Sequence, residues 1–282
     1  MALAPGSTTA AVFKQNAFCA APVVVAREHL QQQPPAYFLV NTGNANAGTG
    51  KAGLADARQC CEALANNAAC DTSAVLPFST GVIGEPLPVD RIVQGIPAAV
   101  ERLDERGWEQ AATGILTTDT VPKGASITTE IVGRTVTITG IAKGAGMIRP
   151  DMATMLAYVA MDATVEQSVL QACLVTAVEK SFNRISVDGD TSTNDACVLV
   201  ATGKSDAPAI TAGSAEFDQL CSAVTQVCVQ LAQAIVRDGE GATRFVTVAV
   251  EGGATRQECL DVGYTIAHSP LVKTALFAGD PN

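Results

Sequence analysis

The sequence feature that most constrains the fold is a long run of apolar side chains at helical spacing, between residues 217 and 235. Its members recur every three or four positions, and they are Phe217, Leu220, Cys221, Val224, Val227, Cys228, Leu231 and Ile235. This spacing predicts an amphipathic helix with one buried face. Another layer of the protein has to cover that face.

A second amphipathic helix is predicted earlier in the chain. Its apolar stripe is shorter and consists of Leu170, Cys173, Leu174, Ala177 and Val178. Thr164 and Gln167 stand three residues apart just before this stripe, which is the spacing of a capping box. We therefore expect these two side chains to cap the start of the helix.

The rest of the chain predicts short strands and two more helices. The expected strands are Ala10–Phe13, Ala21–Ala26, Ala36–Val40, Ala74–Phe78, Thr113–Thr117, Ser126–Val132, Thr135–Ile141, Ala196–Ala201 and Arg244–Val250. The expected helices run from Leu54 to about Ala69 and from Pro88 to Glu105. Gly133-Arg134 would join two of the strands in a type II′ hairpin turn. Because strands and helices do not alternate strictly, the pattern favours an α+β fold or a layered α/β fold with mixed sheets.

Composition and charge exclude several classes of protein. With 282 residues, 48% of them hydrophobic and 16% charged, the chain can bury a substantial core and is not a disordered polypeptide. A formal net charge of −10 argues against non-specific nucleic-acid binding and against docking on an anionic membrane. The longest apolar run, from Met152 to Met161, is too short to span a bilayer.

The nine cysteines include no C-x-x-C pair, and no histidine stands at metal-site spacing from them. Several lie at apolar helical positions, where a free cysteine behaves as a small hydrophobic residue. The start of the sequence lacks the cationic and apolar regions of a signal peptide. We therefore expect reduced structural thiols, no bound metal and a cytoplasmic protein.

The segment Gly48-Thr49-Gly50-Lys51-Ala52-Gly53 matches the G-x-G-x-x-G pattern of dinucleotide sites and precedes a predicted helix. Two details weaken this interpretation. Seven residues separate Gly48 from the expected strand end at Val40, and Asp71 precedes the next strand instead of ending it. A dinucleotide-binding module at Gly48–Gly53 stays an alternative to simple packing of the loop.

Two further segments place small polar groups after predicted strands. Ser79-Thr80-Gly81-Val82-Ile83-Gly84 could aim backbone N–H groups at an oxyanion, although an ordinary β-turn explains it as well. Thr117-Thr118-Asp119-Thr120, together with Lys123, gathers hydroxyls, a carboxylate and an amine on one loop.

The segment Lys143–Leu156 is the most informative, because it places Thr154 after Ala153 in apolar surroundings. Thr154 could be an ordinary helix or strand residue. Alternatively, its hydroxyl could attack the preceding carbonyl and displace the Thr154 nitrogen, and hydrolysis of the resulting ester would complete cleavage of the Ala153–Thr154 bond and make Thr154 a new N-terminus. A free α-amine, with an ordinary pKa of about 7.7–8.0, could then accept the hydroxyl proton near neutral pH. Such chemistry needs no histidine, and the sequence holds only His29 and His268.

Seven blocks of residues, in this order, resemble the ornithine acetyltransferase family of arginine biosynthesis. They are Asn41–Asn46, Ser79–Gly84, Thr117–Thr120, Lys143–Leu156, Ser181–Asp195, Arg237–Ala242 and Ser269–Ala275. The resemblance covers almost the whole chain and implies the layered α/β fold of that family, in two domains. Region 1–153 would carry the oxyanion-hole and substrate loops, and region 154–282 would start at the nucleophile.

By this resemblance, the precursor cleaves itself between Ala153 and Thr154, and Thr154 becomes the nucleophile. Thr154 would accept an acetyl group from N2-acetyl-L-ornithine and pass it to L-glutamate through an acetyl-threonine intermediate. The family's oxyanion hole falls on Thr80 and Gly81. Its substrate contacts fall on Thr118, with Thr117 as a close rival, and on Lys143, Thr154 and Glu240.

The chemistry of two of these residues suits the implied substrates. The ammonium of Lys143 suits a substrate carboxylate, and the carboxylate of Glu240 suits the amine of ornithine or of the acceptor. The resemblance implies no cofactor, although some members of the family use acetyl-CoA as a co-substrate. It also implies an assembly of two α and two β chains, with neither nucleic acid nor a membrane as partner.

Family members usually extend beyond the equivalents of Met1 and Asn282. We therefore expect this chain to lack segments at both ends, with the larger loss at the C-terminus. A rival function with the same self-cleavage is that of an N-terminal-nucleophile amidohydrolase or aminopeptidase, in which water accepts the acyl group instead of glutamate.

Overall fold

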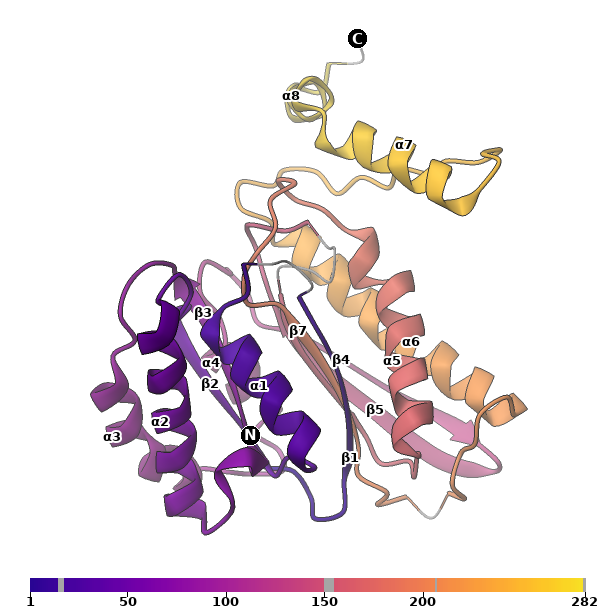
Figure 1. The fold of residues 1–282 in the computed structure, drawn as a ribbon. Helices are drawn as coiled ribbons and strands as arrows, with labels where there is room; N and C mark the ends of the chain where they lie inside the picture. The colour runs from indigo at the N-terminus through magenta and orange to yellow at the C-terminus, as the bar shows by residue number, and fades with distance from the viewer. Residues whose placement is uncertain (15–17, 150–154, 206, 281–282) are drawn as a thin grey trace.

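The computed structural model describes residues 1–14, 18–149, 155–205 and 207–280, and most of its elements are labelled in Figure 1. The strands are β1 (Thr8–Phe13), β2 (Tyr37–Asn44), β3 (Val75–Val82), β4 (Lys123–Ile131), β5 (Arg134–Lys143), β6 (Leu156–Met161) and β7 (Ala196–Ala201). The α-helices are α1 (Ala21–Gln32), α2 (Gly50–Ala68), α3 (Val89–Glu101), α4 (Trp108–Gly114), α5 (Gln167–Lys180), α6 (Ala215–Arg237), α7 (Arg256–His268) and α8 (Pro270–Ala278). Short 3-10 turns, η1 (Thr72–Ala74) and η2 (Phe182–Arg184), precede β3 and follow α5.

Five strands form one mixed sheet, in the order β1-β7-β6-β5-β4, and β2 and β3 form a separate parallel pair. Within the larger sheet β6 and β7 run parallel, whereas the other neighbouring strands are antiparallel. Strands β1, β4 and β5 precede Thr154 in the chain, and β6 and β7 follow it. Both sides of the predicted cleavage point therefore contribute to the same sheet.

The elements form four layers. Helices α5 and α6 cover one face of the five-stranded sheet, and their apolar side chains join those of the strands in one cluster (Figure 1). The opposite face meets the β2–β3 pair, where the rings of Phe38 and Phe78 lie 5.9 and 5.3 Å from the ring of Tyr158 on β6. Helices α1, α2 and α3 bury apolar side chains against β3. This order of layers confirms the predicted layered α/β fold with mixed sheets.

Helix α6 confirms the predicted long amphipathic helix. Its apolar stripe, from Leu220 to Ile235, is buried among α5 and the strands. The hydroxyl of Ser214 caps its start by accepting the N–H of Phe217. Within the described part of the chain, α6 is the one helix long and apolar enough to cross a membrane, and half of its most apolar stretch is buried inside the protein. Packing in the core therefore accounts for its hydropathy.

The predicted strand at Ala21–Ala26 is wrong, because these residues form the first half of α1. Pro22 stands in the first turn of the helix, where the missing N–H costs no hydrogen bond. Val23 belongs to the apolar cluster shared with β2 and β6, and Val25 belongs to another cluster formed with α2 and α3. A helix buried on two sides shows an unbroken apolar run, which periodicity does not distinguish from a buried strand.

Two other predicted strands are also wrong. Thr113–Thr117 lies at the end of α4 and in the loop after it, and Arg244–Val250 forms no regular element. Most of Arg244–Val250 is exposed, and no strand of the described chain pairs with it. Alternating side chains favour a strand only where a neighbour pairs with it and one face is buried.

The hairpin between β4 and β5 turns one residue earlier than predicted. Val132 and Gly133 both have positive φ angles, 53° and 67°. Two consecutive positive φ angles are typical of a type I′ turn, so the predicted type II′ turn at Gly133-Arg134 is wrong.

The predicted capping box is also wrong. Helix α5 starts at Gln167 after Glu166, and no side chain caps it. Thr164 lies further back, and its carbonyl accepts the N–H of Ile210 at 3.0 Å. This extended pairing, continued by Val165 opposite Ile210, holds Thr164 away from the helix start.

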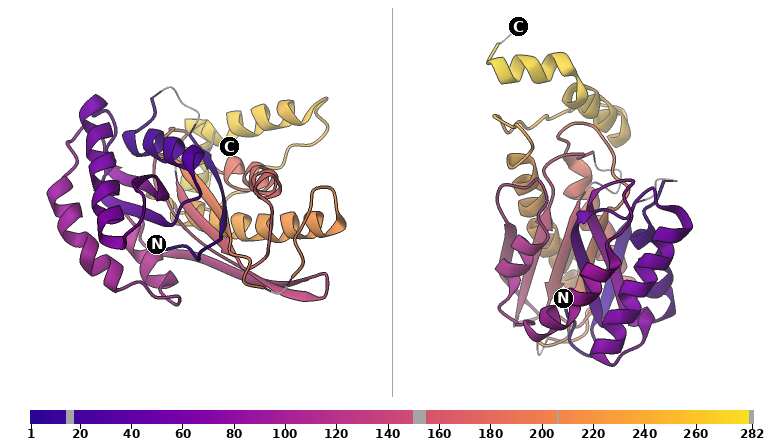
Figure 2. Two further views of the ribbon diagram at one scale, coloured as in Figure 1. Left: turned by 60° about the horizontal axis from the view of Figure 1, so that its bottom comes forward. Right: turned by 90° about the vertical axis from the view of Figure 1, so that its left-hand side faces the viewer.

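Helices α7 and α8 stand away from the layers, beyond the end of α6 (Figure 2). None of their residues is buried. They contact the body of the protein at the segment after α5. The hydroxyl of Tyr264, on α7, donates to the Asn183 carbonyl at 2.7 Å. His268 Nε2 also lies 2.8 Å from the hydroxyl of Ser186.

One end of the five-stranded sheet brings together segments that are far apart in the sequence. Across it, Phe13 pairs with Ala196, Ala196 with Leu156, and Leu156 with Lys143. Strands β1 and β5 therefore end where β6 and β7 begin, and β4 begins nearby at Lys123. The residues immediately outside the four paired positions are Lys14, Asp195, Met155 and Gly144.

Truncation of Leu231 tests the packing of α6 on the sheet. Leu231 is fully buried, and its Cδ1 lies 3.0 Å from the point where a Cβ on Gly140 of β5 would stand. We expect Leu231→Ala to lower the free energy of unfolding by about 2–5 kcal/mol, because it leaves a cavity between α6 and β5. Leu271→Ala, at an exposed fraction of 76% on α8, is the matched control and should change it by less than about 0.5 kcal/mol. Urea unfolding measures both, and equal effects would contradict this packing.

Candidate active site

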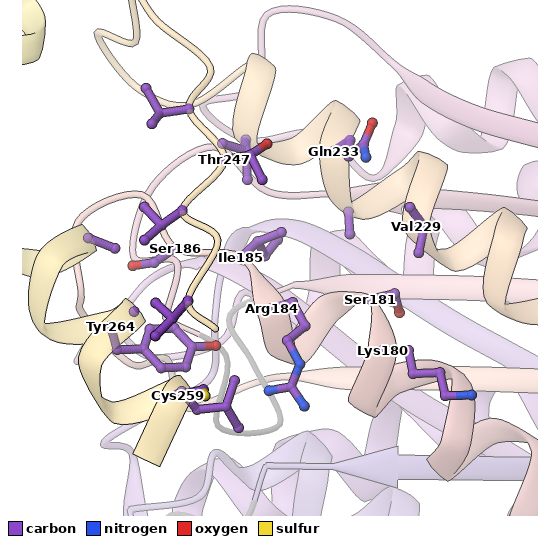
Figure 3. A pocket seen from close by; sticks show the side chains of 18 of the residues that line it. Lys180, Ser181, Arg184, Ile185, Ser186, Val229, Gln233, Thr247, Cys259 and Tyr264 are labelled. Atoms are coloured by element: carbon purple, nitrogen blue, oxygen red, sulfur yellow. The ribbon is translucent and has the colours of Figure 1, made fainter. Parts of the chain in front are cut away.

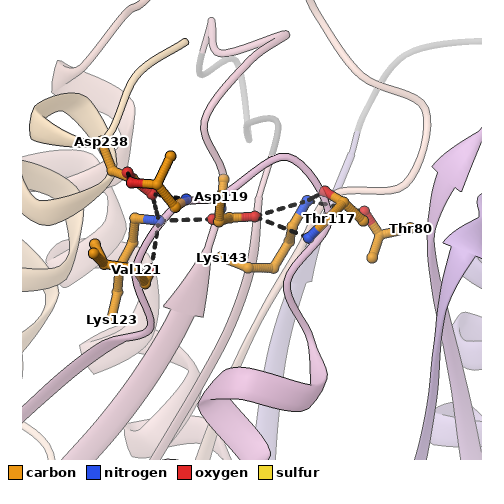
Figure 4. Close-up of polar contacts among 9 residues, drawn as sticks. Thr80, Thr117, Asp119, Val121, Lys123, Lys143 and Asp238 are labelled. Atoms are coloured by element: carbon orange, nitrogen blue, oxygen red, sulfur yellow. Dashed lines mark hydrogen bonds and ion pairs between the residues drawn. The ribbon is translucent and has the colours of Figure 1, made fainter.

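Lys143 ends β5 and lies at the centre of a buried polar cluster (Figure 4). Its exposed fraction is 8%, and its Nζ donates hydrogen bonds to Thr80 Oγ1 at 3.0 Å and to Thr117 Oγ1 at 2.7 Å. Thr80 comes from β3 of the two-stranded sheet, and Thr117 comes from the loop between α4 and β4. The lysine thus joins three separate sequence blocks. Of the rivals Thr117 and Thr118, the structure brings Thr117 to Lys143.

Asp119 fixes the loop that carries Thr117. Its carboxylate is fully buried and accepts hydrogen bonds from Lys123 Nζ at 2.7 Å and from the Gly144 N–H at 2.6 Å. It also accepts the N–H of Thr117 at 3.1 Å, and Lys143 Nζ lies 3.8 Å away. Asp119 therefore holds both lysines and the loop in one geometry.

A second carboxylate, Asp238, completes the cluster from the end of α6. Its Oδ2 lies 2.5 Å from Lys123 Nζ and accepts the N–H of Thr120 at 3.0 Å. The Thr120 hydroxyl donates to its other oxygen. The side chain of Lys123 is 1% exposed, so Asp119 and Asp238 balance its charge inside the protein. These bonds tie the end of α6 to the loop of the candidate site.

Burial and neighbouring charges shift the pKa values of this cluster. Removal from water lowers the pKa of Lys143, and attraction to Asp119 raises it. Removal from water has the larger effect, so the pKa of Lys143 lies below the ordinary value of 10.5. Burial raises the pKa of Asp119, but the hydrogen bonds from its three donors outweigh burial and hold the pKa below the ordinary 3.8. The pKa of Asp238 is lowered in the same way. Both carboxylates are therefore charged at neutral pH.

The predicted oxyanion loop ends β3 and lies against the end of β2. Gly81 has a φ of +135°, and a Cβ there would stand 2.3 Å from the carbonyl carbon of Gly43. This position therefore requires glycine. Gly81 is exposed and Thr80 is half-buried. The bond from Lys143 uses the Thr80 oxygen as an acceptor, which leaves the Thr80 O–H available as a donor.

Glu240 lies in the turn after α6, beside the segment that follows Lys143. Its N–H donates to the Ala145 carbonyl at 2.8 Å, and its carboxylate carbon lies 2.5 Å from the point where a Cβ on Gly146 would stand. The side chain is exposed, and its charge attracts Lys143. The cationic Lys143 and the anionic Glu240 therefore both lie next to the segment that contains Ala145 and Gly146.

Ala153 and Thr154, the predicted cleavage site and nucleophile, lie outside the described residues. The next residue, Met155, is buried. The Met155 carbonyl accepts the N–H of Ala196 at 3.1 Å. The chain that follows Thr154 therefore starts at the same end of the sheet as the Lys143 cluster.

Sequence analysis assigned no individual role to three buried polar residues at this end. Asn194 and Asp195 precede β7, and Lys14 follows β1, with exposed fractions of 7%, 3% and 2%. Lys14 Nζ lies 3.8 Å from Asp195 Oδ2. The one signal in the sequence is position, since each polar residue stands at the end of an apolar strand.

The glycine-rich segment is filled by its own side chains. Strand β2 continues to Asn44, four residues beyond its expected end, and α2 begins at Gly50, so that β2, α2 and β3 form a parallel βαβ unit. A Cβ at Gly53 would stand 1.9 Å from Thr49 Oγ1 and 2.4 Å from Asn46 Oδ1. The Asn46 side-chain amide also donates to the Gly53 carbonyl at 2.9 Å. These contacts favour a packed loop over a phosphate cradle.

A pocket of about 430 Å³ lies elsewhere, between α6, residues 245–250 and α7 (Figure 3). Arg184, Gln233 and Tyr264 are among the residues that line it, and none of the predicted site residues does. The pocket forms because α7 stands away from the body of the protein. It therefore does not indicate where the active site lies.

Both histidines lie outside the Lys143 cluster. His29 Nδ1 is 2.8 Å from the Val75 carbonyl, and His268 contacts Ser186. All nine cysteines are free in the structure, and six of them are buried. Within the described ranges, no group of His, Cys, Asp and Glu side chains is arranged to hold a metal ion.

Comparison with known proteins places the chain beside enzymes of arginine biosynthesis. A family model described as the ArgJ family matches residues 1–282. The arginine biosynthesis bifunctional protein ArgJ of Pseudomonas syringae pv. tomato is 61% identical over 283 residues, which covers 100% of this chain and 70% of the relative.

Two solved structures are also similar to the chain. The crystal structure of the arginine biosynthesis bifunctional protein ArgJ from Bacillus halodurans is 38% identical and covers 54% of this chain and 77% of its own, with a TM-score of 0.46. Ornithine acetyltransferase from Mycobacterium tuberculosis, complexed with ornithine, is 32% identical and covers 55% of this chain and 78% of its own, with a TM-score of 0.43.

Removal of the Lys123 charge tests the buried cluster. We expect Lys123→Met to lower the free energy of unfolding by about 3–5 kcal/mol at pH 7, because two buried carboxylates lose their nearest cation. The folded-state pKa values of Asp119 and Asp238 lie below 3.8, so their contribution is present above that pH and is lost as the pH falls through the lowered values. The difference between parent and variant should therefore shrink below about pH 4.

Urea unfolding between pH 2 and pH 7 measures this difference. Lys51→Met, at an exposed lysine of α2, is the matched control and should change stability by less than about 0.5 kcal/mol at every pH. A pH-independent difference for Lys123→Met would show that the lysine stabilises the fold by packing alone.

Proposed function

The chain belongs to the ArgJ family of arginine biosynthesis proteins, and from this premise we propose that it moves an acetyl group from N2-acetyl-L-ornithine to L-glutamate. It would first cleave its own Ala153–Thr154 bond and then carry the acetyl group on Thr154. The observation that supports this most is the Lys143 cluster, which joins Thr80 and Thr117 at the sheet end where the chain resumes after Thr154.

The proposed transfer proceeds in two steps, acetylation of Thr154 and then transfer of the acetyl group to glutamate. The Thr154 hydroxyl attacks the acetyl carbonyl of acetylornithine while the α-amine of Thr154 takes its proton. The C–N bond of the substrate then breaks, and ornithine leaves with that proton on its amine. The amine of glutamate attacks the acetyl-threonine ester in turn, which restores the Thr154 hydroxyl and gives N-acetylglutamate.

Thr80 and Gly81 are proposed to stabilise the oxyanion that forms in both steps. The Thr80 hydroxyl, whose oxygen already accepts the bond from Lys143, offers its O–H as one donor. The Gly81 backbone N–H offers the second, and the glycine allows the close approach to β2 that this loop requires. Donors fixed before the reaction stabilise developing charge without reorganising.

Substrate binding is proposed to rest on two opposite charges and a threonine. An ammonium has three N–H donors, and Lys143 directs two of them to threonine hydroxyls, so a third remains for a substrate carboxylate. Glu240 would bind the amine of ornithine or of glutamate. Thr117 is favoured over Thr118 as the threonine of the site, because it reaches Lys143.

Further parts of the proposal concern the whole assembly. Regions 1–153 and 154–282 would form the α and β chains, and two copies of each would assemble. Acetyl-CoA would serve as a second acetyl donor if the enzyme also acetylates glutamate directly. The free thiols support a reducing compartment such as the cytoplasm.

Intact-mass measurement of the protein tests the nucleophile. We expect two fragments from the parent chain, with Thr154 at the new N-terminus, and one uncut chain from Thr154→Ala, because alanine lacks the attacking hydroxyl. Thr113→Ala removes an exposed threonine of α4 and is the control, which should be cleaved like the parent. A parent that is fully active without cleavage would overturn the role of Thr154.

Substitution of Lys143 tests the substrate site. We expect Lys143→Ala to lower kcat/KM for acetylornithine by about 10- to 100-fold, because a charge-assisted hydrogen bond to the substrate carboxylate is lost. Lys51→Ala should leave kcat/KM unchanged. An unchanged kcat/KM for Lys143→Ala would remove this lysine from the site.

Product analysis separates the rival functions. With acetylornithine alone an amidohydrolase releases acetate at the full rate, whereas the proposed transferase requires glutamate and forms N-acetylglutamate. A dinucleotide-binding module at Gly48–Gly53 would instead be stabilised against heat by NAD and would not need Thr154.

A further inference from the structure

Several hydrogen bonds fix the backbone that follows Lys143, a segment called the strap from here on and defined as Gly144–Ile148. Its first N–H donates to Asp119 at 2.6 Å. Its last two N–H groups donate to the two carboxylate oxygens of Asp188, at 2.5 and 3.0 Å. Its last carbonyl accepts the N–H of Val187 at 2.9 Å. Carboxylates therefore anchor both ends of the strap.

The turn after α6, which carries Glu240, is held against the strap through its own backbone. The N–H of Glu240 donates to the Ala145 carbonyl at 2.8 Å. Two residues earlier, Asp238 is bound to the buried Lys123, with its Oδ2 2.5 Å from Nζ. The backbone of Glu240 is therefore fixed relative to the strap, and the conformation of its side chain decides where its carboxylate lies.

Gly146, in the middle of the strap, provides the space in which that carboxylate lies. A Cβ on Gly146 would stand 2.5 Å from Glu240 Cδ, and 2.6 and 2.7 Å from its two oxygens. Such distances are much shorter than a van der Waals contact. The φ of Gly146 lies outside the positive region that favours glycine. The position of the Glu240 carboxylate therefore requires glycine here, and the φ of the strap does not.

The position of this carboxylate determines where the proposed substrate site carries its negative charge. The Glu240 side chain is exposed, so a bound molecule can reach it, and its charge attracts the buried ammonium of Lys143. A small ligand with a carboxylate at one end and an ammonium at the other matches these two charges. An amino acid with an amine at the end of its side chain has this pattern.

We propose that Gly146 is a positioning residue for specificity, because the missing Cβ lets the Glu240 carboxylate lie where it binds the side-chain ammonium of the acetyl donor. This inference rests on the proposed function and names the class of donor that the site prefers. The preferred class has a side-chain ammonium, and an uncharged side chain of the same length binds less well. Gly146 does not have to touch the substrate, since it acts through Glu240.

Gly146→Ala tests this role with little disturbance of the fold. The added Cβ meets the end of a flexible, exposed side chain, so the Glu240 carboxylate moves while the backbone contacts of the strap stay in place. Gly95→Ala, on α3, is the matched control, because no atom lies within 4 Å of its added Cβ. Thermal unfolding and circular dichroism establish that both variants are folded like the parent.

Titration calorimetry with two ligands measures the preference. L-ornithine carries the side-chain ammonium, and L-norvaline has the same carbon chain without it. We expect Gly146→Ala to raise the Kd for ornithine by about 10- to 100-fold, because a charge-assisted hydrogen bond is lost, and to change the Kd for norvaline by less than about twofold. Gly95→Ala should leave both Kd values as in the parent.

A double-mutant cycle shows whether Gly146 acts through Glu240. Glu240→Gln removes the charge and keeps the size of the side chain, so it should raise the Kd for ornithine by a similar factor. In that background Gly146→Ala should change the Kd for ornithine by less than about twofold, because the carboxylate on which it acts is already gone. A merely structural role would weaken both ligands and would add its effect to that of Glu240→Gln.

The outcomes separate this inference from the proposed function. If the parent shows no acetyl transfer from acetylornithine, the proposed function fails and the inference fails with it. If the parent is active and Gly146→Ala keeps the parent's ratio of the two Kd values, the inference is wrong and the proposed function stands. The same conclusion follows if Gly146→Ala and Glu240→Gln have additive effects on the binding of ornithine.

Discussion

The buried carboxylate of Asp119 is the interaction on which the rest of the candidate site depends. It lies between two buried lysines, Lys123 and Lys143, whose charges would otherwise repel each other in a region shielded from water. The same carboxylate accepts two backbone N–H groups, one from its own loop and one from Gly144. Through Lys123 it also reaches Asp238 and the end of α6. One residue thus fixes the loop, the end of β5 and a helix of the opposite layer.

The sheet topology explains why self-cleavage would leave the site intact. Leu156, two residues after Thr154, pairs with Lys143 on one side and with Ala196 on the other. Strand β6 is therefore held between β5 and β7, whether or not the chain continues before it. A new N-terminus at Thr154 would stay at the end of the sheet, beside residues from both fragments. After the proposed cleavage, the hydrogen bonds of the sheet would hold the two fragments together.

Sequence patterns were informative where one face of an element is buried, as in α6 and β4. They failed at α1, because a helix buried on two sides shows the same unbroken apolar run as a strand buried on both faces, such as β7, and at Arg244–Val250, which no strand of the described chain pairs with. The same limit applies to the site. Lys143 and Glu240 stay predictions from their blocks, whereas the preference for Thr117 over Thr118 depends on which hydroxyl reaches Lys143. The contacts of Asn194 could not be predicted, because its partners Ala45 and Ser79 are 149 and 115 residues away in sequence.

Two buried carboxyl groups at this end of the sheet each lie near a buried lysine, Asp119 near Lys123 and Asp195 near Lys14. Asp119 accepts the N–H of Gly144, so it holds the backbone one residue beyond Lys143, a group with a proposed chemical role. Buried charges are costly for stability, so the Asp119–Lys123 pair favours a role in geometry over a role in folding free energy. A site without an imidazole has to rely on such fixed geometry, because its base and its nucleophile would belong to the same residue.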